Sequence, residues 1–247
     1  MTGRDTTPRP PEPIRRFYKE ATVAPHAGGE ARILLDNRPV RTPAKAHLAA
    51  PPAIAERIAA EWNAQGDYIL PISMPMTRLA NTAIDGVTAA LDPVKDDIAK
   101  MAQSDLVMYR ADFPAGLVAE QKAHWDPVVA FAEDALGVRI LLAEGIMPVE
   151  QDPRLSEGVR RRLPATPLPL AAFHQLTTLT GSALTTLAFT EALLDFERAW
   201  QVAHVDEDWN IREWGEDAEA AARRAQRRKD AEAAAFVLRP DAVPAAS

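Results

Sequence analysis

The feature that most constrains the fold is a change in the hydropathy pattern along the chain. Up to about residue 50, short apolar segments with loose alternation end at turn-forming residues, as is typical of antiparallel strands. From residue 86 onward, apolar residues recur almost only at helical spacing. The sequence therefore predicts an α+β protein with a small N-terminal mainly-β domain followed by a larger all-helical domain.

The expected domain organisation follows composition as well as periodicity. Residues 1–14 are rich in proline and polar residues, which predicts a disordered tail. Residues 15–85 form the β-rich domain with one or two helices, and residues 86–240 form the helical domain. A second disordered tail is expected over residues 241–247.

Turn residues divide the N-terminal part into strands. Asp36-Asn37-Arg38 separates two apolar segments, and Asp-Asn tolerates positive φ, so we expect a tight hairpin there. Expected strands are Phe17–Ala24, Ala31–Leu35, Val40–Thr42 and His47–Ala49.

A helix should begin at Pro52, because proline is favoured in the first turn. Ile54, Ile58 and Trp62 recur every four residues and define a buried stripe, and Gly66 is expected to terminate the helix. The next helix should start near Met76. On that helix Leu79, Ala83 and Ile84 should face inward, and Arg78, Asn81 and Asp85 should lie on another, polar side.

The helical part shows several boundary signals. Asp92-Pro93 resembles an N-cap followed by proline, and Gly181-Ser182 separates two segments that are apolar on nearly all sides. Residues 138–144 are expected to be a short extended segment. The further helices are expected at 117–136 with a bend at Asp126-Pro127, 153–163, 170–179, 183–200 and 221–235.

Composition excludes several classes of protein. The net charge of −7 argues against general nucleic-acid binding, which requires a basic surface. The chain has no cysteine, so disulfides and thiolate metal sites are excluded. No apolar run reaches the ~18 residues of a membrane span, and the N-terminus resembles neither a signal peptide nor a mitochondrial presequence. A cytoplasmic, monomeric protein without stable membrane insertion is expected.

The segment His204–Glu219, HVDEDWNIREWGEDAE, is the strongest candidate for a functional surface. It contains two tryptophans and seven acidic residues. Large apolar side chains among carboxylates either anchor a segment in its own core or form a docking edge for a partner. Both interpretations are open at this level.

A metal or catalytic site in this segment is a weaker interpretation. His204, Asp206 and Asp208 alternate, and alternate residues on a helix point to different faces, so we expect no metal there. The alternative function is a small hydrolase that uses His174 or His204 with carboxylates of residues 206–217. Ser182 lies outside any GxSxG elbow, and no nucleotide-binding motif is present, so no cofactor is expected.

The basic run Arg223–Lys229 follows the acidic segment directly. Acids near the start of a helix and bases near its end complement the helix dipole, which favours a solvated helix over a nucleic-acid contact.

Six motifs together resemble one family, the assembly chaperones that act on the α subunit of F-type ATP synthase. The resemblance covers residues from about 15 to 238. It is carried by RFYKEATV (16–23), LLDNRPVRTP (34–43), EWNAQGDYILPISMPMTRLANTAID (61–85), DLVMYRA (105–111), WDPVVAFAEDALG (125–137) and HVDEDWNIREWGEDAEA (204–220).

The resemblance implies a non-enzymatic protein that binds the nucleotide-binding domain of the free α subunit and prevents its aggregation before the α/β hexamer assembles. Eukaryotic relatives act in the mitochondrial matrix, whereas the lack of a presequence here suggests a bacterial, cytoplasmic relative. The partner-binding residues that we predict are Asp206, Glu207, Asp208, Trp209, Glu213, Trp214, Arg78, Asn81 and Asp85.

Overall fold

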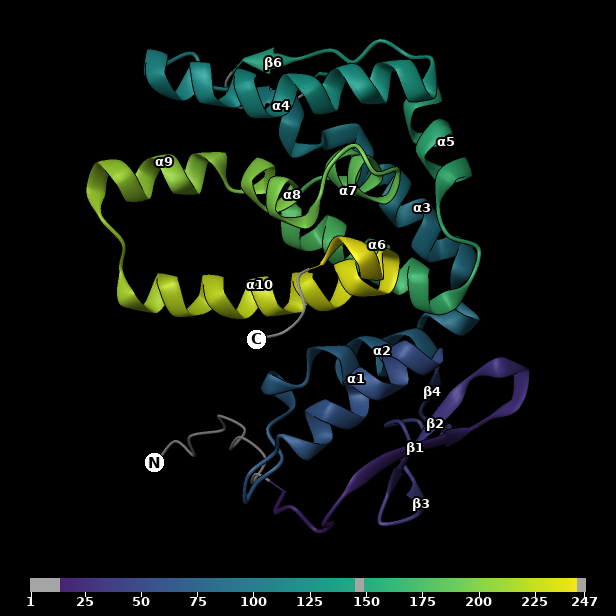
Figure 1. Cartoon of the computed structure of the whole chain (residues 1–247). Coiled ribbons are helices and arrows are strands. Elements are labelled where there is room, and N and C mark those ends of the chain that lie inside the picture. Colours follow the sequence, from purple (N-terminus) through teal and green to yellow (C-terminus); the bar gives the residue numbers. More distant parts are fainter. Residues whose placement is uncertain (1–13, 145–148, 244–247) are drawn as a thin grey trace, which may run out of the picture. The chain divides into compact units, whose positions relative to one another are not determined.

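The computed structural model describes residues 14–144 and 149–243 (Figure 1). It divides the chain into two units. The first comprises the chain up to Arg41 together with His47–Arg78, and the second comprises Thr42–Ala46 and the chain from Leu79. Strands are concentrated in the first unit and helices in the second, which confirms the predicted α+β class. Most of the two predicted disordered tails lies outside the described residues.

A four-stranded antiparallel sheet forms the β part of the first unit. Strand β2 is central: it pairs with β1 through the register Ala21↔Leu35 to Pro25↔Ala31 and also pairs with β3 and β4. Alternate residues of β2, among them Ile33, are buried, as the period of two requires. The strands are β1 (Ala21–Pro25), β2 (Ala31–Leu35), β3 (Arg38–Pro39) and β4 (Ala49–Ala50).

The predicted hairpin between β2 and β3 is present. Asp36 and Asn37 adopt φ angles of 45° and 66°, the left-handed conformation that a two-residue hairpin loop requires. The predicted strand from Phe17 was too long, since β1 starts at Ala21. The Arg16 side chain donates hydrogen bonds to the carbonyls of Tyr18 and Lys19, and so occupies backbone acceptors that a longer strand would use.

Helix α1 (Pro52–Asn63) follows the sheet and begins at the predicted proline. Ile54 and Ile58 are buried as expected, but Trp62 is only half-buried. Gly66 does not terminate the helix, because the helix ends at Asn63 and Gly66 lacks a positive φ. A polar side chain, Gln65, organises the end of α1 instead: its Nε2 donates to the Glu61 carbonyl at 3.0 Å, and its Oε1 accepts from Leu70 N at 2.8 Å.

Helix α2 (Pro75–Asp85) spans the boundary between the two units, which falls between Arg78 and Leu79. Leu79 and Ala83 are buried as predicted, whereas Ile84 is half-buried. The helices of the second unit then follow in order: α3 (Leu91–Met101), α4 (Ala115–Leu136), α5 (Pro153–Arg162), α6 (Pro167–Thr180), α7 (Ala183–Thr190), α8 (Phe196–Ala203), α9 (Val205–Trp214) and α10 (Ala218–Leu238).

Short elements connect the longer ones. Strands β5 (Tyr109–Arg110) and β6 (Ala143–Glu144) form a parallel pair, so part of the predicted extended segment 138–144 is a strand. The 3-10 helices are η1 (Ala27–Gly29), η2 (Pro71–Ser73), η3 (Val87–Ala89), η4 (Ala102–Ser104), η5 (Leu106–Met108) and η6 (Pro240–Ala242).

The core of the second unit is built around α6 and α7. Every residue of α7 from Ala183 to Phe189 is buried, and α10 packs along α6. The predicted helix 183–200 is broken, since α7 ends at Thr190 and Ala192 has a φ of 64°. A new helix, α8, starts where Asp195 accepts a hydrogen bond from Arg198 N at 2.8 Å.

Two helix starts also differ from the prediction. Helix α3 begins at Leu91 with Ala90 as its N-cap, so Asp92 lies in the first turn, where it forms an ion pair with Arg160 at 2.9 Å. Helix α10 begins at Ala218, capped by Asp217, three residues earlier than expected. Within the described ranges, no helix combines the length and the apolar character that crossing a membrane requires.

Candidate partner-binding surface

The acidic-aromatic segment folds as helix α9 and the start of α10. His204 is the N-cap of α9, and three acids occupy its first turn: Asp206, Glu207 and Asp208. Negative charge at this end is stabilised by the unpaired N–H groups and the helix dipole. The helix ends at Gly215, whose φ of 86° suits glycine. The position of the three acids in the first turn therefore favours formation of α9.

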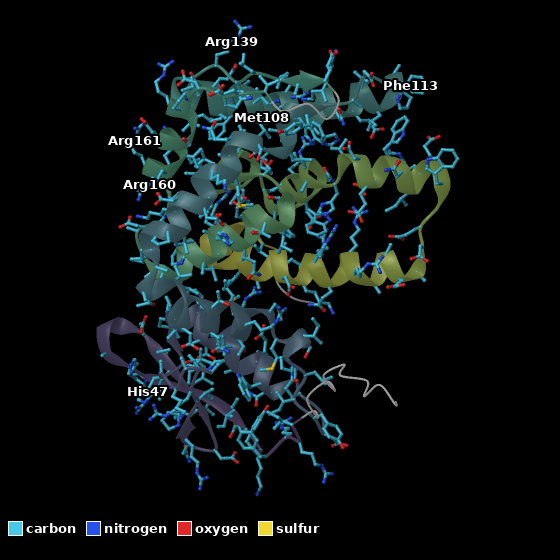
Figure 2. The ribbon with its side chains drawn as sticks, turned by 180° about the vertical axis from the view of Figure 1, so that it is seen from behind. His47, Met108, Phe113, Arg139, Arg160 and Arg161 are labelled. Carbon is cyan, nitrogen blue, oxygen red and sulfur yellow. The ribbon has the colours of Figure 1, made fainter. Side chains whose placement is uncertain are left out.

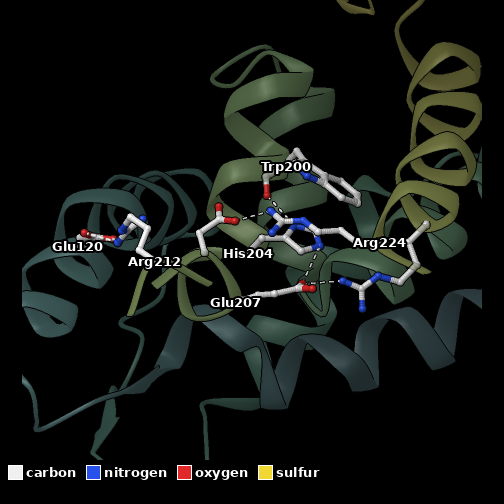
Figure 3. Close-up of polar contacts among 8 residues, drawn as sticks. Glu120, Trp200, His204, Glu207, Arg212 and Arg224 are labelled. Atoms are coloured by element: carbon white, nitrogen blue, oxygen red, sulfur yellow. Dashed lines mark hydrogen bonds and ion pairs between the residues drawn. The ribbon is translucent and has the colours of Figure 1, made fainter. Parts of the chain in front are cut away.

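Ion pairs join α9 to α10. Glu207 pairs with Arg227 at 2.8 Å, and Asp208 pairs with Arg224. Figure 3 shows the carboxylate of Glu207 between the His204 ring and an arginine side chain. The predicted basic run thus has acidic partners inside the chain, which supports the interpretation of a solvated, self-paired helix.

A third acid, Asp206, points toward α4. Its Oδ1 accepts a hydrogen bond from Gln121 Nε2 at 2.8 Å, and Gln121 Oε1 accepts in turn from Ala111 N at 2.7 Å. Gln121, at the middle of this relay, is 2% exposed, whereas Ala111 and Asp206 at its two ends are half-buried. Arg212 adds a second link between the two helices through its ion pair with Glu120. Polar and charged side chains of the first and last turns of α9 therefore link the helix to α4 and α10.

The indole of Trp209 lies directly on Gly116 in the first turn of α4. A Cβ atom placed on Gly116 would come within 2.3 Å of the Trp209 ring, so no larger residue fits without displacement of the ring. Arg212 also contacts this indole: its guanidinium carbon lies over the Trp209 ring, 5.5 Å from the ring centroid. Trp209 is half-buried, and it anchors the helix more than it presents a free surface.

The last turn of α9 is different, because it is open to solvent. Trp214 is 85% exposed, the largest exposure among the large apolar side chains of the described residues, and Glu213 beside it is exposed as well. Phe113, just before α4, is 81% exposed (Figure 2). We call Phe113, Glu213 and Trp214 the α9 tip surface. Because Trp209 contacts Gly116, α9 lies beside the start of α4, which Phe113 precedes.

The other predicted residues lie elsewhere on α2. Asp85 accepts hydrogen bonds from Thr42 Oγ1 at 2.6 Å and Ala44 N at 2.9 Å, which hold the loop 42–46 on the second unit. The Oδ1 atom of Asn81 is buried without a hydrogen-bond partner among the described residues. Arg78 belongs to the first unit and donates from Nε to the Pro71 carbonyl at 3.0 Å.

The two candidate catalytic histidines occupy unrelated environments. His204 is 3% exposed, stacks on Trp200 at a centroid distance of 3.9 Å, and donates from Nδ1 to the Trp200 carbonyl at 2.8 Å. Burial lowers the pKa of His204. His174 instead contacts Asp97 at 2.9 Å at the surface. Of the alternative hydrolase arrangement, the structure contains one pairing, His204 Nε2 with Glu207 at 3.7 Å, and it lies at a buried histidine.

The side chains of His204, Asp206 and Asp208 do not converge on one point. The three side chains point to Trp200, Gln121 and Arg224, on three different elements. Within residues 14–144 and 149–243, no three His, Cys, Asp or Glu side chains gather in a way that could hold a metal ion.

A buried carboxylate that the sequence did not single out lies at the start of α7. Asp105 Oδ2 accepts a hydrogen bond from Leu184 N at 2.9 Å, and Oδ1 accepts one from Val107 N at 3.3 Å. Burial raises its pKa to about 6, although the hydrogen bonds act in the opposite direction. Its place in the DLVMYRA motif was the only sequence signal, because a short acid in a loop usually indicates a cap or a turn.

Within the described residues, the candidate site is an exposed aromatic and acidic helix end, a composition typical of a surface that binds another protein. A family model described as ATP12 chaperone protein matches residues 15–133. The mitochondrial protein atp12 of Schizosaccharomyces pombe is 24% identical over 229 residues, which cover 85% of this chain and 77% of that protein.

Solved structures extend the match to most of the chain. The Atu1473 protein of Agrobacterium tumefaciens is 46% identical, with a TM-score of 0.83 and coverage of 91% of this chain and 85% of its own. Atp12 from Paracoccus denitrificans is 35% identical, with a TM-score of 0.81 and coverage of 91% and 97%. The chain belongs to the ATP12 chaperone family.

Proposed function

We propose that this chain is a non-enzymatic assembly chaperone that binds the free α subunit of F-type ATP synthase through its nucleotide-binding domain. Binding would keep the subunit from aggregating until the α/β hexamer forms. Family membership supports the chaperone role, and the long motifs of the sequence support the α subunit as the partner. The solved relatives are bacterial, which favours a protein of the bacterial cytoplasm. We propose that it acts as a monomer.

The physical need for such a protein is clear. A subunit made before its partners exposes an apolar interface that promotes aggregation. A temporary partner must cover part of that interface with apolar groups and use polar groups at the rim to set orientation and allow release. The α9 tip surface has this composition, because it combines the exposed rings of Phe113 and Trp214 with the exposed carboxylate of Glu213.

The single observation that carries the proposal is the exposure of Trp214 on a helix that is otherwise firmly held. An indole that is 85% exposed contributes little to folding, whereas tryptophan at an interface is a frequent source of binding energy. The acids Asp206, Glu207 and Asp208 have a positioning role in this proposal, and so does Trp209. Arg78, Asn81 and Asp85 stay a separate prediction of partner contact.

The direct test measures capture of isolated α subunit by the purified chain and suppression of α-subunit aggregation by light scattering. We expect Trp214→Ala to weaken capture by about ten-fold or more. We expect Glu213→Lys mainly to slow association and to change its salt dependence.

Matched controls separate this surface from general effects. Leu193→Ala removes another exposed apolar side chain, and Glu157→Lys makes the same charge change on α5. Neither control should alter capture. The proposal is wrong if the unaltered chain neither captures the α subunit nor reduces its aggregation, and the tip assignment is wrong if Trp214→Ala captures normally.

A further inference from the structure

The first unit contains a second feature suited to binding, a cavity of about 500 Å³ beside the β2–β3 hairpin. Its lining comes from the residues before β1, from the hairpin and from the end of α1. All of these belong to the same unit, so the cavity is formed without any contribution from the second unit. Neither the family match nor the α9 tip surface accounts for it.

One wall of the cavity is aromatic. The rings of Phe17 and Tyr18 lie 5.5 Å apart and meet edge to face, and those of Tyr18 and Trp62 are also 5.5 Å apart. The Tyr18 hydroxyl donates to the Trp62 carbonyl at 2.6 Å, which fixes the middle ring. Phe17 is 71% exposed and Trp62 is only half-buried, so the wall presents aromatic surface to an incoming group. This position explains why Trp62 is not a core residue.

The hairpin side of the cavity combines the apolar residues Leu35, Pro39 and Val40 with two arginines and one acid. Arg38 and Arg41 are exposed side chains at the hairpin, and Asp36 is the only acid among the lining residues. Both oxygens of Asp36 already accept hydrogen bonds from the backbone N–H of Lys19, and one also accepts from Glu20. These bonds lower the pKa of Asp36 and keep the carboxylate engaged with the backbone.

The same bias extends over the described part of the first unit. Residues 14–41 and 47–78 contain eight arginine or lysine residues and six acids, although the whole chain has a net charge of −7. The acidic and the basic binding features of this protein are therefore on different units.

We propose that the cavity receives an acidic peptide segment of the client, in which a large apolar side chain lies against Phe17 and Trp62 and an adjacent carboxylate binds the guanidinium of Arg38. Arginine is suited to this contact, because its planar fork binds a carboxylate through two hydrogen bonds. That the client is the α subunit rests on the proposed function. The chemistry of the segment rests on the cavity alone.

A defined peptide tests the chemistry without the client. The probe is a fluorescein-labelled heptapeptide with one phenylalanine between two glutamates, and its binding to the full chain is measured by fluorescence anisotropy at low salt. Two comparison peptides carry lysines in place of the glutamates or alanine in place of the phenylalanine. We expect saturable binding of the first peptide, and at least about ten-fold weaker binding of either comparison peptide.

Variants of the chain locate the contact. Arg38→Glu should weaken binding of the acidic peptide by about ten-fold or more, and Phe17→Ala should weaken it as well. Arg38→Lys should retain part of the affinity. Arg161→Glu is the matched control. It makes the same charge change at a side chain that is 68% exposed and lies on α5, in the second unit (Figure 2). Absence of saturable binding, or equal losses for Arg38→Glu and Arg161→Glu, would overturn the proposal.

The client experiment is read separately. Capture of isolated α subunit by Arg38→Glu should fall at least several-fold relative to Arg161→Glu, with unchanged thermal unfolding. If the unaltered chain does not capture the α subunit at all, the proposed function fails, and the peptide measurement still decides the chemistry of the cavity. If capture is normal in Arg38→Glu, the cavity is not a client site.

Discussion

Arg224 on α10 forms an ion pair with Asp208 on α9, and both side chains are largely shielded, with 18% and 32% of their surfaces exposed. The pair joins two helices that are connected by only three residues, Gly215 to Asp217. It therefore holds together a helical hairpin, and Trp214 lies at the end of α9 next to the connecting residues. The geometry of the α9 tip surface depends on this closure.

The contribution of this pair to stability can be measured by a double-mutant cycle. Because the pair is only partly buried, we expect a coupling free energy of about 0.5–1 kcal/mol between Asp208→Ala and Arg224→Ala in urea unfolding. The coupling should decrease at high salt. The matched pair Glu219 and Arg223, which is more exposed, should show a smaller coupling; an equal coupling for both pairs would contradict the argument.

The contact of Trp209 with Gly116 predicts that the effect of Gly116→Ala on stability depends on whether the Trp209 ring is present. Gly116→Ala should destabilise the protein by about 1–2 kcal/mol, because the new methyl group collides with the indole. In a Trp209→Ala background the same change should be neutral or stabilising by up to about 1 kcal/mol, because alanine is the better helix former. Thermal or urea unfolding of the four proteins measures the cycle, and a loss of equal size in both backgrounds would show that the ring does not matter.

Asp105 predicts a pH dependence with a definite sign. Its pKa is raised from 3.8 to about 6 by burial, so the folded state binds a proton more tightly than the unfolded state. Stability from this group is complete below pH ~4 and is lost as pH rises through about 6, by a total on the order of 2–3 kcal/mol.

The measurement compares urea unfolding of the unaltered chain with that of Asp105→Asn across this range. The asparagine variant is less stable at low pH, since its single amide oxygen cannot serve both Val107 N and Leu184 N, but it lacks the titration. The stability difference should therefore narrow from pH 4.5 to pH 7. A difference that widens toward neutral pH would contradict the assignment.

Two tryptophans of the second unit should behave in opposite ways. Trp125 is 1% exposed and donates from Nε1 to the Val202 carbonyl at 2.8 Å, so Trp125→Ala should cost about 3–5 kcal/mol of stability. Trp214→Ala should change stability by less than about 0.5 kcal/mol, because its ring is already in solvent. Thermal unfolding distinguishes them, and a large loss in Trp214→Ala would mean that the indole packs on its own chain.

Local chemistry made much of the fold predictable. The Asp36-Asn37 dipeptide predicted the hairpin because these residues tolerate positive φ, and Pro52 marked the start of α1 because its ring suits a first turn. The break at Ala192 gave no such signal. Alanine favours helices, and its positive φ is imposed by the burial of α7 on one side and the Asp195 cap on the other.

The candidate site was predictable in position but not in its internal contacts. The composition of α9 singled out Asp206, Glu207 and Asp208, yet their hydrogen-bond and ion-pair partners lie on α4 and α10. Side-chain partners on other helices depend on tertiary packing, which periodicity does not contain. For the same reason the exposure of Phe113 and the role of Gly116 under Trp209 were missed, although a glycine in the first turn of a helix indicates a close approach.

The loop 42–46 has a consequence for the connectivity of the molecule. Because Asp85 holds Thr42 and Ala44, the chain leaves the first unit after Arg41, returns at His47 and leaves again after Arg78. The backbone thus passes between the two units three times instead of once. Neither unit can be excised as an uninterrupted fragment with all of its own residues. A single proteolytic cut inside the loop would sever the chain before the cut from the rest of the molecule, whereas residues 47–78 of the first unit would stay covalently joined to the second unit through α2.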